Sequence, residues 1–468
     1  MNLDILPFEE SDLGFRPGAE ARATTWLEKL FLSMVGIGVL VFCVSFLWPG
    51  SLGSSWGGWL MLGAAGLGSV GYFLVSYGRT TPGIKNHGVF HNGAFNRGAV
   101  GWLLGITFTA FYVMLYWHPS SLEGPIRLMD PLSALLAGQP ADQWFLYGSF
   151  YTFAVLVMGV RMLMKYRHNN YQIVRTLSVS FFQLGFGFAI PNLLKKMHQP
   201  DFYFTYFWPL KPDYLLPFDY VMGAESSIWA AEVSGFSLGR FMIIWGAGMT
   251  FVATPVLTYF FGKRWYCSWV CGCGGLAETL GDPWRQLSDN SDKSWRIERW
   301  SIHLVLVSIV LLTGFMWMNE MSGRAWLGND GSGLFWKSYG FLIVMAFSGV
   351  IGVGFYPLMG SRVWCRFGCP MAAILGIFQR FFSRFRITTN GSQCISCGNC
   401  TVYCEMGIDV RAYAQRQENI VRASCVGCGV CAAVCPRGVL RLEGGPVTVR
   451  FEGSDNPLND LASSLKKW

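Results

Sequence analysis

Two runs of cysteines near the C-terminal end of the chain carry its clearest chemistry. Both runs have the spacing C-x2-C-x2-C-x3-C, and the second is followed by Pro436. Four thiolates at such short intervals are the ligand set of a [4Fe–4S] cluster, so two runs predict two clusters. Pairs of C-x2-C also bind zinc, but two complete four-cysteine runs favour iron–sulfur clusters.

This spacing is that of bacterial two-cluster ferredoxins, in which the fourth cysteine of each run ligates the other cluster. The spacing therefore assigns one [4Fe–4S] cluster to Cys394, Cys397, Cys400 and Cys435. The second cluster is assigned to Cys425, Cys428, Cys431 and Cys404. Glu405 follows Cys404 where proline is usual, and this predicts a looser corner there.

A second cysteine pattern occurs twice upstream. Residues 262–271 and 360–369 both read G-x-R-x-aromatic-C-x-aromatic-x-C, which indicates an internal duplication; we call these segments the first and second elbow. Cysteines four positions apart share a face on helical backbone. The four thiolates could thus hold one further iron–sulfur cluster. Core packing and a reversible disulfide are the alternatives. The candidate ligands are Cys267, Cys271, Cys365 and Cys369, with Cys273 as a tentative addition.

One histidine lies inside a predicted membrane segment. His303 is one turn into an apolar run, where an ionisable residue is a functional candidate by default. It could relay a proton, orient a quinone or lie beside a cluster. A hydrogen-bonded structural histidine is the alternative.

The composition indicates an integral membrane protein. Of 468 residues, 52% are hydrophobic and 14% are charged, against about 25% charged in soluble chains. Lys and Arg gather in short loops between apolar runs, which argues against nucleic-acid binding. We expect spans, each of about 20 residues, at 26–48, 56–77, 99–117, 144–164, 173–191, 237–261, 300–318 and 335–357.

Loop charge predicts the orientation. The basic loops fall on one side if the spans alternate, and basic loops face the cytoplasm. Both termini and the ferredoxin domain are then cytoplasmic, at a bacterial inner membrane. The first residues are polar and mixed in charge, unlike a signal peptide. The expected fold is a polytopic α-helical membrane protein with about eight spans and a C-terminal α+β ferredoxin domain.

The expected organisation has five parts. The outer loop within the second part is rich in proline and aromatic residues, and could cap the bilayer surface or dock a periplasmic partner. The parts are a cytoplasmic segment 1–25, a five-span region 26–236 with a long outer loop 192–236, a three-span elbow region 237–386, the ferredoxin domain 387–445 and a polar tail 446–468.

The region from about 237 to 445 resembles the membrane polyferredoxin family that includes NapH, NosR and CcoG. In that family two C-x3-C-P elbows precede a two-cluster ferredoxin domain. The second elbow matches fully at Cys365, Cys369 and Pro370, whereas the first has Gly272 in place of proline. The first 236 residues are outside the resemblance.

The resemblance implies a membrane-bound electron-transfer protein, with a NapH-like quinol dehydrogenase component as the nearest functional analogue. It would relay electrons between the quinone pool, or a membrane redox partner, and the [4Fe–4S] clusters. It could do so as a subunit of a respiratory complex. The alternative is a redox assembly factor for a partner oxidase or reductase.

Overall fold

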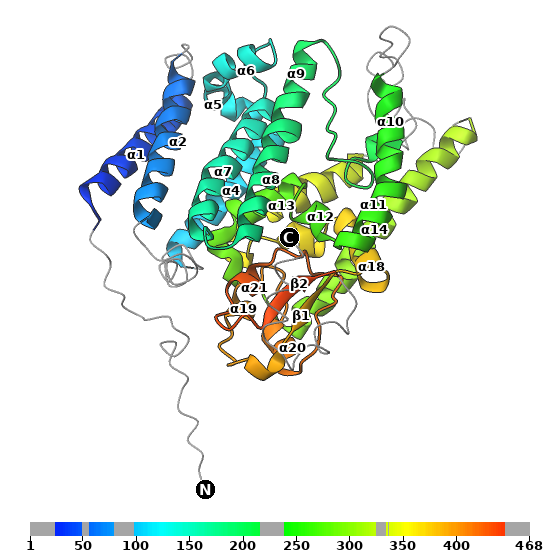
Figure 1. Cartoon of the computed structure of the whole chain (residues 1–468). Helices are drawn as coiled ribbons and strands as arrows, with labels where there is room; N and C mark the ends of the chain where they lie inside the picture. Colours follow the sequence, from blue (N-terminus) through cyan, green and yellow to red (C-terminus); the bar gives the residue numbers. More distant parts are fainter. Residues whose placement is uncertain are drawn as a thin grey trace.

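The computed structural model describes residues 24–48, 56–78, 98–215, 238–323, 334–335 and 337–444. Seven helical segments in this part of the chain are long and apolar enough to cross a membrane. They form a bundle, with the cysteine-rich C-terminal part below one end (Figure 1). The prediction of a polytopic helical membrane protein with a C-terminal cysteine-rich domain is confirmed. The segments are α1 (Trp26–Leu47), α2 (Gly57–Gly78), α4 (Ala99–Trp117), α7 (Gln143–Lys165), α8 (Asn170–Leu184) with α9 (Ile190–Lys196), α10 (Leu238–Gly248) with α11 (Thr254–Phe261), and α14 (Asp292–Met321).

Two of these segments contain a π-helical turn. Gly185–Ala189 (η4) joins α8 to α9, and Met249–Ala253 (η7) joins α10 to α11. Pro191 and Pro255 follow the two turns. A proline has no amide hydrogen and its ring displaces the carbonyl of the preceding turn, so the helix widens there and continues.

The eighth predicted span is shorter than expected. The described helix covers residues 334–335 and Lys337–Ile351, and much of it is the π-helix η9 (Gly340–Ile351). At about 1.5 Å per residue, Lys337–Ile351 alone is shorter than a hydrocarbon core of about 30 Å. A turn at 352–355 and Pro357 end the helix, and α16 (Tyr356–Met359) follows. A full eighth span is therefore not found among the described residues.

The segment between α4 and α7 folds into short helices that close one end of the bundle. They are η3 (Pro119–Leu122), α5 (Glu123–Leu128) and α6 (Asp130–Leu136). Leu122, Leu128 and Met129 are buried beneath them against the spans. The apolar side of these helices thus belongs to the core of the bundle.

The predicted outer loop 192–236 is described over residues 192–215, which are the end of α9 and a following segment, 197–215. The segment descends beside α9 toward the elbows (Figure 1), and η5 (Pro212–Leu215) ends its described part. Phe207 is fully buried and packs on Tyr266 of the first elbow, with ring centroids 5.4 Å apart. The Tyr266 hydroxyl donates to the carbonyl of Thr205 at 2.7 Å. Residues 216–236, the N-terminal residues 1–23 and the predicted tail 446–468 lie outside the described residues.

Short helices form the elbows and the ferredoxin region. The elbows contain α12 (Arg264–Cys267) and α17 (Val363–Phe367), followed by α13 (Gly272–Thr279) and α18 (Pro370–Phe381). A 3-10 turn, η8 (Asp282–Leu287), links α13 to α14. The ferredoxin region contains η10 (Gly391–Gln393), α19 (Asn399–Val402), α20 (Val410–Gln415) and α21 (Val430–Ala433).

A two-stranded antiparallel sheet closes the ferredoxin region. Strand β1 (Arg386–Thr389) pairs with β2 (Leu440–Glu443), in the register Ile387 to Leu442 and Thr389 to Leu440. The first and last segments of the region are thereby tied together, which brings the two cysteine runs face to face. One hydrophobic core contains both the elbow cysteines and the inside of this region. The elbows and the ferredoxin region are therefore packed as one body.

Candidate metal centres

Four cysteines from the two runs line a cavity at the exposed end of the ferredoxin region. Its void is about 360 Å³ including the open mouth. Three cysteines come from the first run and the fourth from the end of the second. We call them the outer set: Cys394, Cys397, Cys400 and Cys435.

The other four cysteines of the runs line a second cavity, of about 380 Å³, nearer the membrane helices. We call them the inner set: Cys404, Cys425, Cys428 and Cys431. The structure thus sorts the cysteines into the two crossed groups that the spacing predicts. Each cavity gathers four thiols, the donor set that a [4Fe–4S] cluster requires.

The fourth cysteine of each run occupies an equivalent position. The amide of Ile408 donates to the Cys404 sulfur, and the amide of Val439 donates to the Cys435 sulfur, both at 3.4 Å. Burial raises the pKa of the Cys404 thiol to about 11. Such thiols keep their protons unless a metal cation takes their place. The donors, their spacing and the amides directed at sulfur therefore fit an iron–sulfur cluster in each set.

The inner set is held by the membrane helices through its backbone. Gln172 and Arg175 of α8 both donate to the carbonyl of Cys428 at 2.9 Å. Ser268 of the first elbow donates to the carbonyl of Val426 at 2.8 Å. Gln379 of α18 donates to the carbonyl of Cys425 at 2.7 Å. The loop that carries three inner-set cysteines is thus anchored to α8 and to both elbow regions.

The two elbows have the same local backbone structure. Gly262 and Gly360 open them with φ of 68° and 90°, a region that suits glycine. In each elbow, the amide of the second cysteine then donates to the carbonyl of the aromatic residue five positions before it. These bonds join Cys271 to Tyr266 at 2.8 Å and Cys369 to Trp364 at 2.9 Å. Cys271 and Cys369 occupy the N-cap positions of α13 and α18.

Gly272 has a steric reason to replace the proline of the second elbow. A Cβ atom at this position would lie 2.4 Å from the Tyr206 hydroxyl and 2.7 Å from Oε1 of Gln183. The segment that descends from the outer side therefore fills the space that a proline ring would need. Helix α13 nevertheless begins at Gly272 as α18 begins at Pro370.

The four elbow thiols lie in one buried cluster. Cys267, Cys271, Cys365 and Cys369 are each no more than 6% exposed. Burial, helped by the nearby Cys271 and Cys365 thiols and opposed by Lys263, raises the pKa of Cys267 to about 12. Burial also raises the pKa of Cys369, as do the three other thiols. The donor set therefore fits a metal centre inside the membrane-helix part of the protein.

Cys273 lies next to this cluster, on the first turn of α13. Its thiol is hydrogen-bonded with that of Cys271, and this bond is the main cause that lowers the pKa of Cys271 to about 7. The structure thus brings the tentative fifth cysteine close to the predicted four. It occupies the position of Met371 in the second elbow, so only the first elbow has a spare thiol.

His303 does not face the cysteines directly. Its Nδ1 atom lies 2.6 Å from the carbonyl oxygen of Arg299 on the same helix, and its side chain is exposed. It lines a large cavity whose wall also includes Cys365. The structure therefore gives His303 a structural hydrogen bond at the rim of a cavity that reaches the elbow.

The surroundings of Glu405 differ from those that the sequence predicts. We expected a looser corner after Cys404, but Glu405 is fully buried. Its carboxylate lies 2.9 Å from Arg285 and 3.0 Å from Arg362, in ion pairs without hydrogen-bond geometry. Its carbonyl accepts a hydrogen bond from Ser288 at 2.7 Å. The corner is tight because the glutamate joins the cluster loop to both elbow regions.

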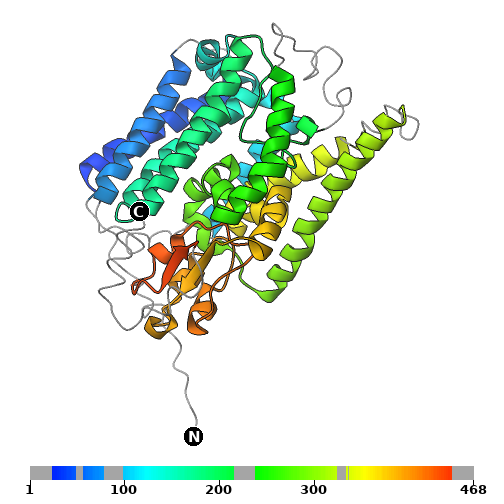
Figure 2. The same cartoon turned by 45° about the vertical axis from the view of Figure 1, so that its right-hand side comes forward.

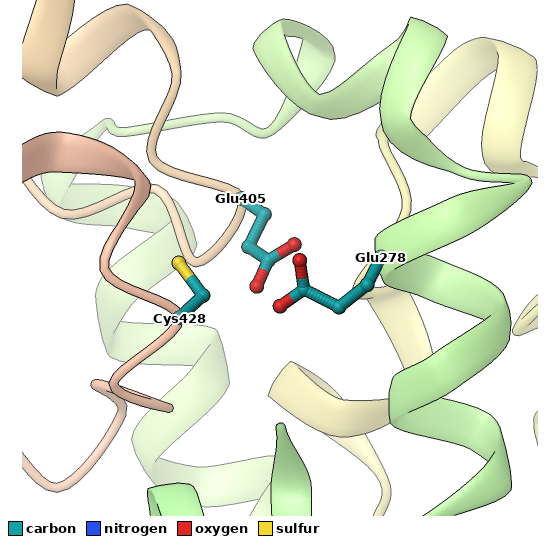
Figure 3. A group of neighbouring side chains, drawn as sticks. All are labelled: Glu278, Glu405 and Cys428. Carbon is teal, nitrogen blue, oxygen red and sulfur yellow. The ribbon is translucent and has the colours of Figure 1, made fainter. Parts of the chain in front are cut away.

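A second buried glutamate faces Glu405. Figure 3 shows Glu278 of α13 directed at Glu405, with Cys428 beside them. The three ligand atoms lie within 4.8 Å of one another, as metal ligands would. However, Arg285 lies 2.8 Å and Arg362 2.7 Å from the Glu278 carboxylate. The guanidinium groups supply the positive charge, so this is an ion-pair network and not a metal site.

The two glutamates are in opposite electrostatic situations. Burial opposes ionisation of Glu278, but Arg175, Arg285 and Arg362 together outweigh it and hold its pKa below the usual range. Burial raises the pKa of Glu405, and the neighbouring Glu278 carboxylate adds to this against the two arginines. Three arginines thus face two carboxylates beside the inner set.

Asp282 extends the network to the fourth span. It lies 2.7 Å from both Arg161 and Lys165 of α7, and 3.3 Å from Arg285. All of these side chains are at most 2% exposed. The sequence signal that could have revealed this network is the set of charged residues within or beside apolar runs, because such residues need buried partners.

Comparisons with known proteins agree with this geometry. A family model described as a 4Fe-4S dicluster domain matches residues 393–440. A model described as a 4Fe-4S binding domain matches residues 244–288 and 340–388, which contain the two elbows. No solved structure matches the chain.

Two curated proteins of Escherichia coli (strain K12) are similar to the chain. The putative electron transport protein YccM is 28% identical over 193 residues, which are 37% of this chain and 50% of that protein. The ferredoxin-type protein NapH is 28% identical over 161 residues, which are 33% of this chain and 51% of that protein. The chain thus spans about half the length of the curated relatives it matches. Together with the helical bundle and the two 4Fe-4S matches, these similarities support the resemblance of the chain to NapH-like membrane polyferredoxins.

Proposed function

We propose that the chain is a membrane-bound electron-transfer protein. It relays electrons between the quinone pool, or a membrane redox partner, and two [4Fe–4S] clusters held by the inner and outer sets. The observation that carries this proposal is the position of the inner set between the elbows and the outer set. Ser268 and Gln379 bind its loop from the elbow side. On the other side, the outer-set Cys400 is among the neighbouring thiols that raise the pKa of the inner-set Cys431.

The elbow cysteines are proposed to hold a third iron–sulfur cluster. Two observations support this: the four thiols share one buried cluster, and the matching 4Fe-4S binding model covers both elbows. Arg362 lies 3.6 Å from the Cys365 sulfur and can offset the negative charge of ligated thiolates. Such a cluster would supply a one-electron step between the membrane and the inner set.

We propose that the five-span region 26–236 fixes the position of the ferredoxin domain 387–445 against the elbow region 237–386. Helix α8 binds the inner-set loop through Gln172 and Arg175. Helix α7 binds η8 through Asp282. The basic loops support a cytoplasmic position for the ferredoxin domain at a bacterial inner membrane.

An anaerobic iron count tests the third cluster. We expect about twelve iron atoms per chain in the wild type and about eight after the joint change of Cys267, Cys271, Cys365 and Cys369 to Ala, since each cluster holds four. A Cys43→Ala variant, outside every predicted set, is the matched control. A count of about eight in both the wild type and the quadruple variant would refute the third cluster.

Reconstitution with menaquinol tests the quinone relay. We expect bleaching of the cluster absorbance when menaquinol is added to the protein in anaerobic liposomes, and recovery with menaquinone. Absorbance that does not respond to either quinone rules out the quinone pool as the direct partner. In cells, loss of an electron relay leaves a mature but electron-starved partner enzyme, whereas loss of an assembly factor leaves an apoenzyme.

A further inference from the structure

A large cavity lies at the junction of the membrane helices and the ferredoxin region, and Cys365 is the one candidate cluster ligand in its lining. Its void is about 1310 Å³ including its open mouth. The lower end of α14 forms one wall, α18 another, and the ferredoxin segment 421–424 the third. The views in Figures 1 and 2 agree that the lower end of α14 lies beside α18 and the ferredoxin region.

The polar lining of this cavity is strongly basic. Five cations line it: Lys263, Arg299, Arg366, Arg380 and Arg422. The single acidic side chain in the lining, Glu298, is already paired with Arg366 at 2.7 Å. No carboxylate among the described residues pairs with the other four cations. The cavity therefore has an unmatched positive charge, which suits an anionic occupant.

A tryptophan at the mouth brings two of these cations together. The guanidinium of Arg299 lies 5.0 Å from the centroid of the Trp295 ring, and that of Arg422 lies 5.2 Å from the same ring. Arg299 belongs to α14 and Arg422 to the ferredoxin segment. Two cations on one ring repel each other, and an anion between them would offset that repulsion.

Part of the remaining wall is apolar and includes an exposed aromatic side chain. Ile302, Ile377 and Phe381 line it, and Phe381 is 68% exposed. The neighbouring Trp300 is 80% exposed on α14. Exposed aromatic side chains at the end of a span mark the level of the lipid headgroups. The cavity thus offers cations and an apolar slot at headgroup level.

We propose that this cavity binds an anionic phospholipid of the leaflet that faces the ferredoxin region. Its phosphate lies among Arg299, Arg380 and Arg422, and an acyl chain follows Ile377 and Phe381. Basic pockets between helices at this face of a membrane suit acidic headgroups. A neutral quinone ring would leave the cations unmatched. The lipid joins α14 and α18 to the loop that leads into Cys425, and so holds the ferredoxin region against the membrane.

Native mass spectrometry of the purified, cluster-loaded protein tests the proposal. Phosphatidylglycerol and phosphatidylcholine are titrated separately onto delipidated protein. We expect phosphatidylglycerol to bind the wild type at least tenfold more tightly. The triple change Arg299→Gln, Arg380→Gln and Arg422→Gln should remove this preference. The matched control, Arg127→Gln with Arg416→Gln and Arg441→Gln, removes the same charge from exposed positions elsewhere. It should keep the preference for phosphatidylglycerol.

Further arms separate the alternatives. If the triple variant loses its cluster absorbance, the single variant Arg380→Glu, changed at an exposed position, is tested instead. It should bind phosphatidylglycerol at least tenfold more weakly than the wild type. Inorganic phosphate should not displace the lipid; displacement would mean a site for free phosphate and overturn the proposal. Displacement by a short-chain menaquinone analogue would overturn it in favour of a quinone site. Equal binding of both lipids by the wild type, or an unchanged preference in the arginine variants, would also overturn it.

Discussion

The buried pair between Glu405 and the elbow arginines should control how firmly the inner set is docked. The change Glu405→Gln keeps the volume of the side chain and removes its charge. Removing one partner of a buried ion pair costs about 3–5 kcal/mol. In the variant, Arg285 and Arg362 still have Glu278 as an ion-pair partner, at 2.8 Å and 2.7 Å. We therefore expect a destabilisation at the lower end of this range, about 3 kcal/mol. This corresponds to a roughly 100-fold rise in local opening.

Hydrogen exchange measures this opening at the amides of residues 404–410. The matched control is Glu418→Gln, which breaks an exposed pair with Arg416, 3.1 Å long, in the same region. An exposed pair is worth about 0–1 kcal/mol, so the control should change exchange by no more than about fivefold. Equal exchange rates in Glu405→Gln and Glu418→Gln would refute the view that Glu405 anchors the junction.

Three further predictions follow from other parts of the junction. Gly272→Ala should lower the thermal unfolding midpoint, because overpacking costs about 1–3 kcal/mol. The added change Tyr206→Phe should restore part of the lost stability; no recovery in the double variant contradicts the steric account. Asp282→Asn should destabilise the protein by about 3–5 kcal/mol, measured by denaturant unfolding. Burial opposes ionisation of Asp282, but Lys165, Arg161 and Arg285 hold its pKa well below the usual range. Its stabilisation is therefore complete above the unfolded value of about 3.9 and is lost as the pH falls through the folded pKa. The gap between the wild type and Asp282→Asn should therefore stay constant from about pH 7 to 5; a gap that closes within that range contradicts the assignment. Removal of iron by a chelator under oxidising conditions should expose the ferredoxin region to protease, because eight buried or half-buried thiols then lose the metal that links them. Unchanged protection of residues 387–444, measured against the α7–α8 spans as the internal reference, contradicts this.

Cysteine spacing and hydrophobic pattern carried the predictions that local chemistry decides. The runs from Cys394 to Cys435 predict two crossed groups of four, and the two cavities contain those groups. Seven of the eight apolar runs are helices long enough to span. These features follow from short-range rules of ligand spacing and helix length. The eighth run failed because apolar composition does not reveal the turn at 352–355, where backbone geometry ends the helix.

The junction could not be predicted from the pattern of residues. The sequence shows Glu405 and Gly272 as departures from proline; Glu405 suggested a looser corner, and Gly272 left the backbone and ligand set of the first elbow open. Tertiary structure gives each a partner far away in the chain: Arg285 and Arg362 for Glu405, and Tyr206 for Gly272. The sequence by itself determined the membrane class and the crossed cysteine groups, because these depend on local spacing and composition. Tertiary structure alone decided how the clusters' loops meet the membrane helices, because a buried charge is tolerated only where distant segments bring it a counter-charge.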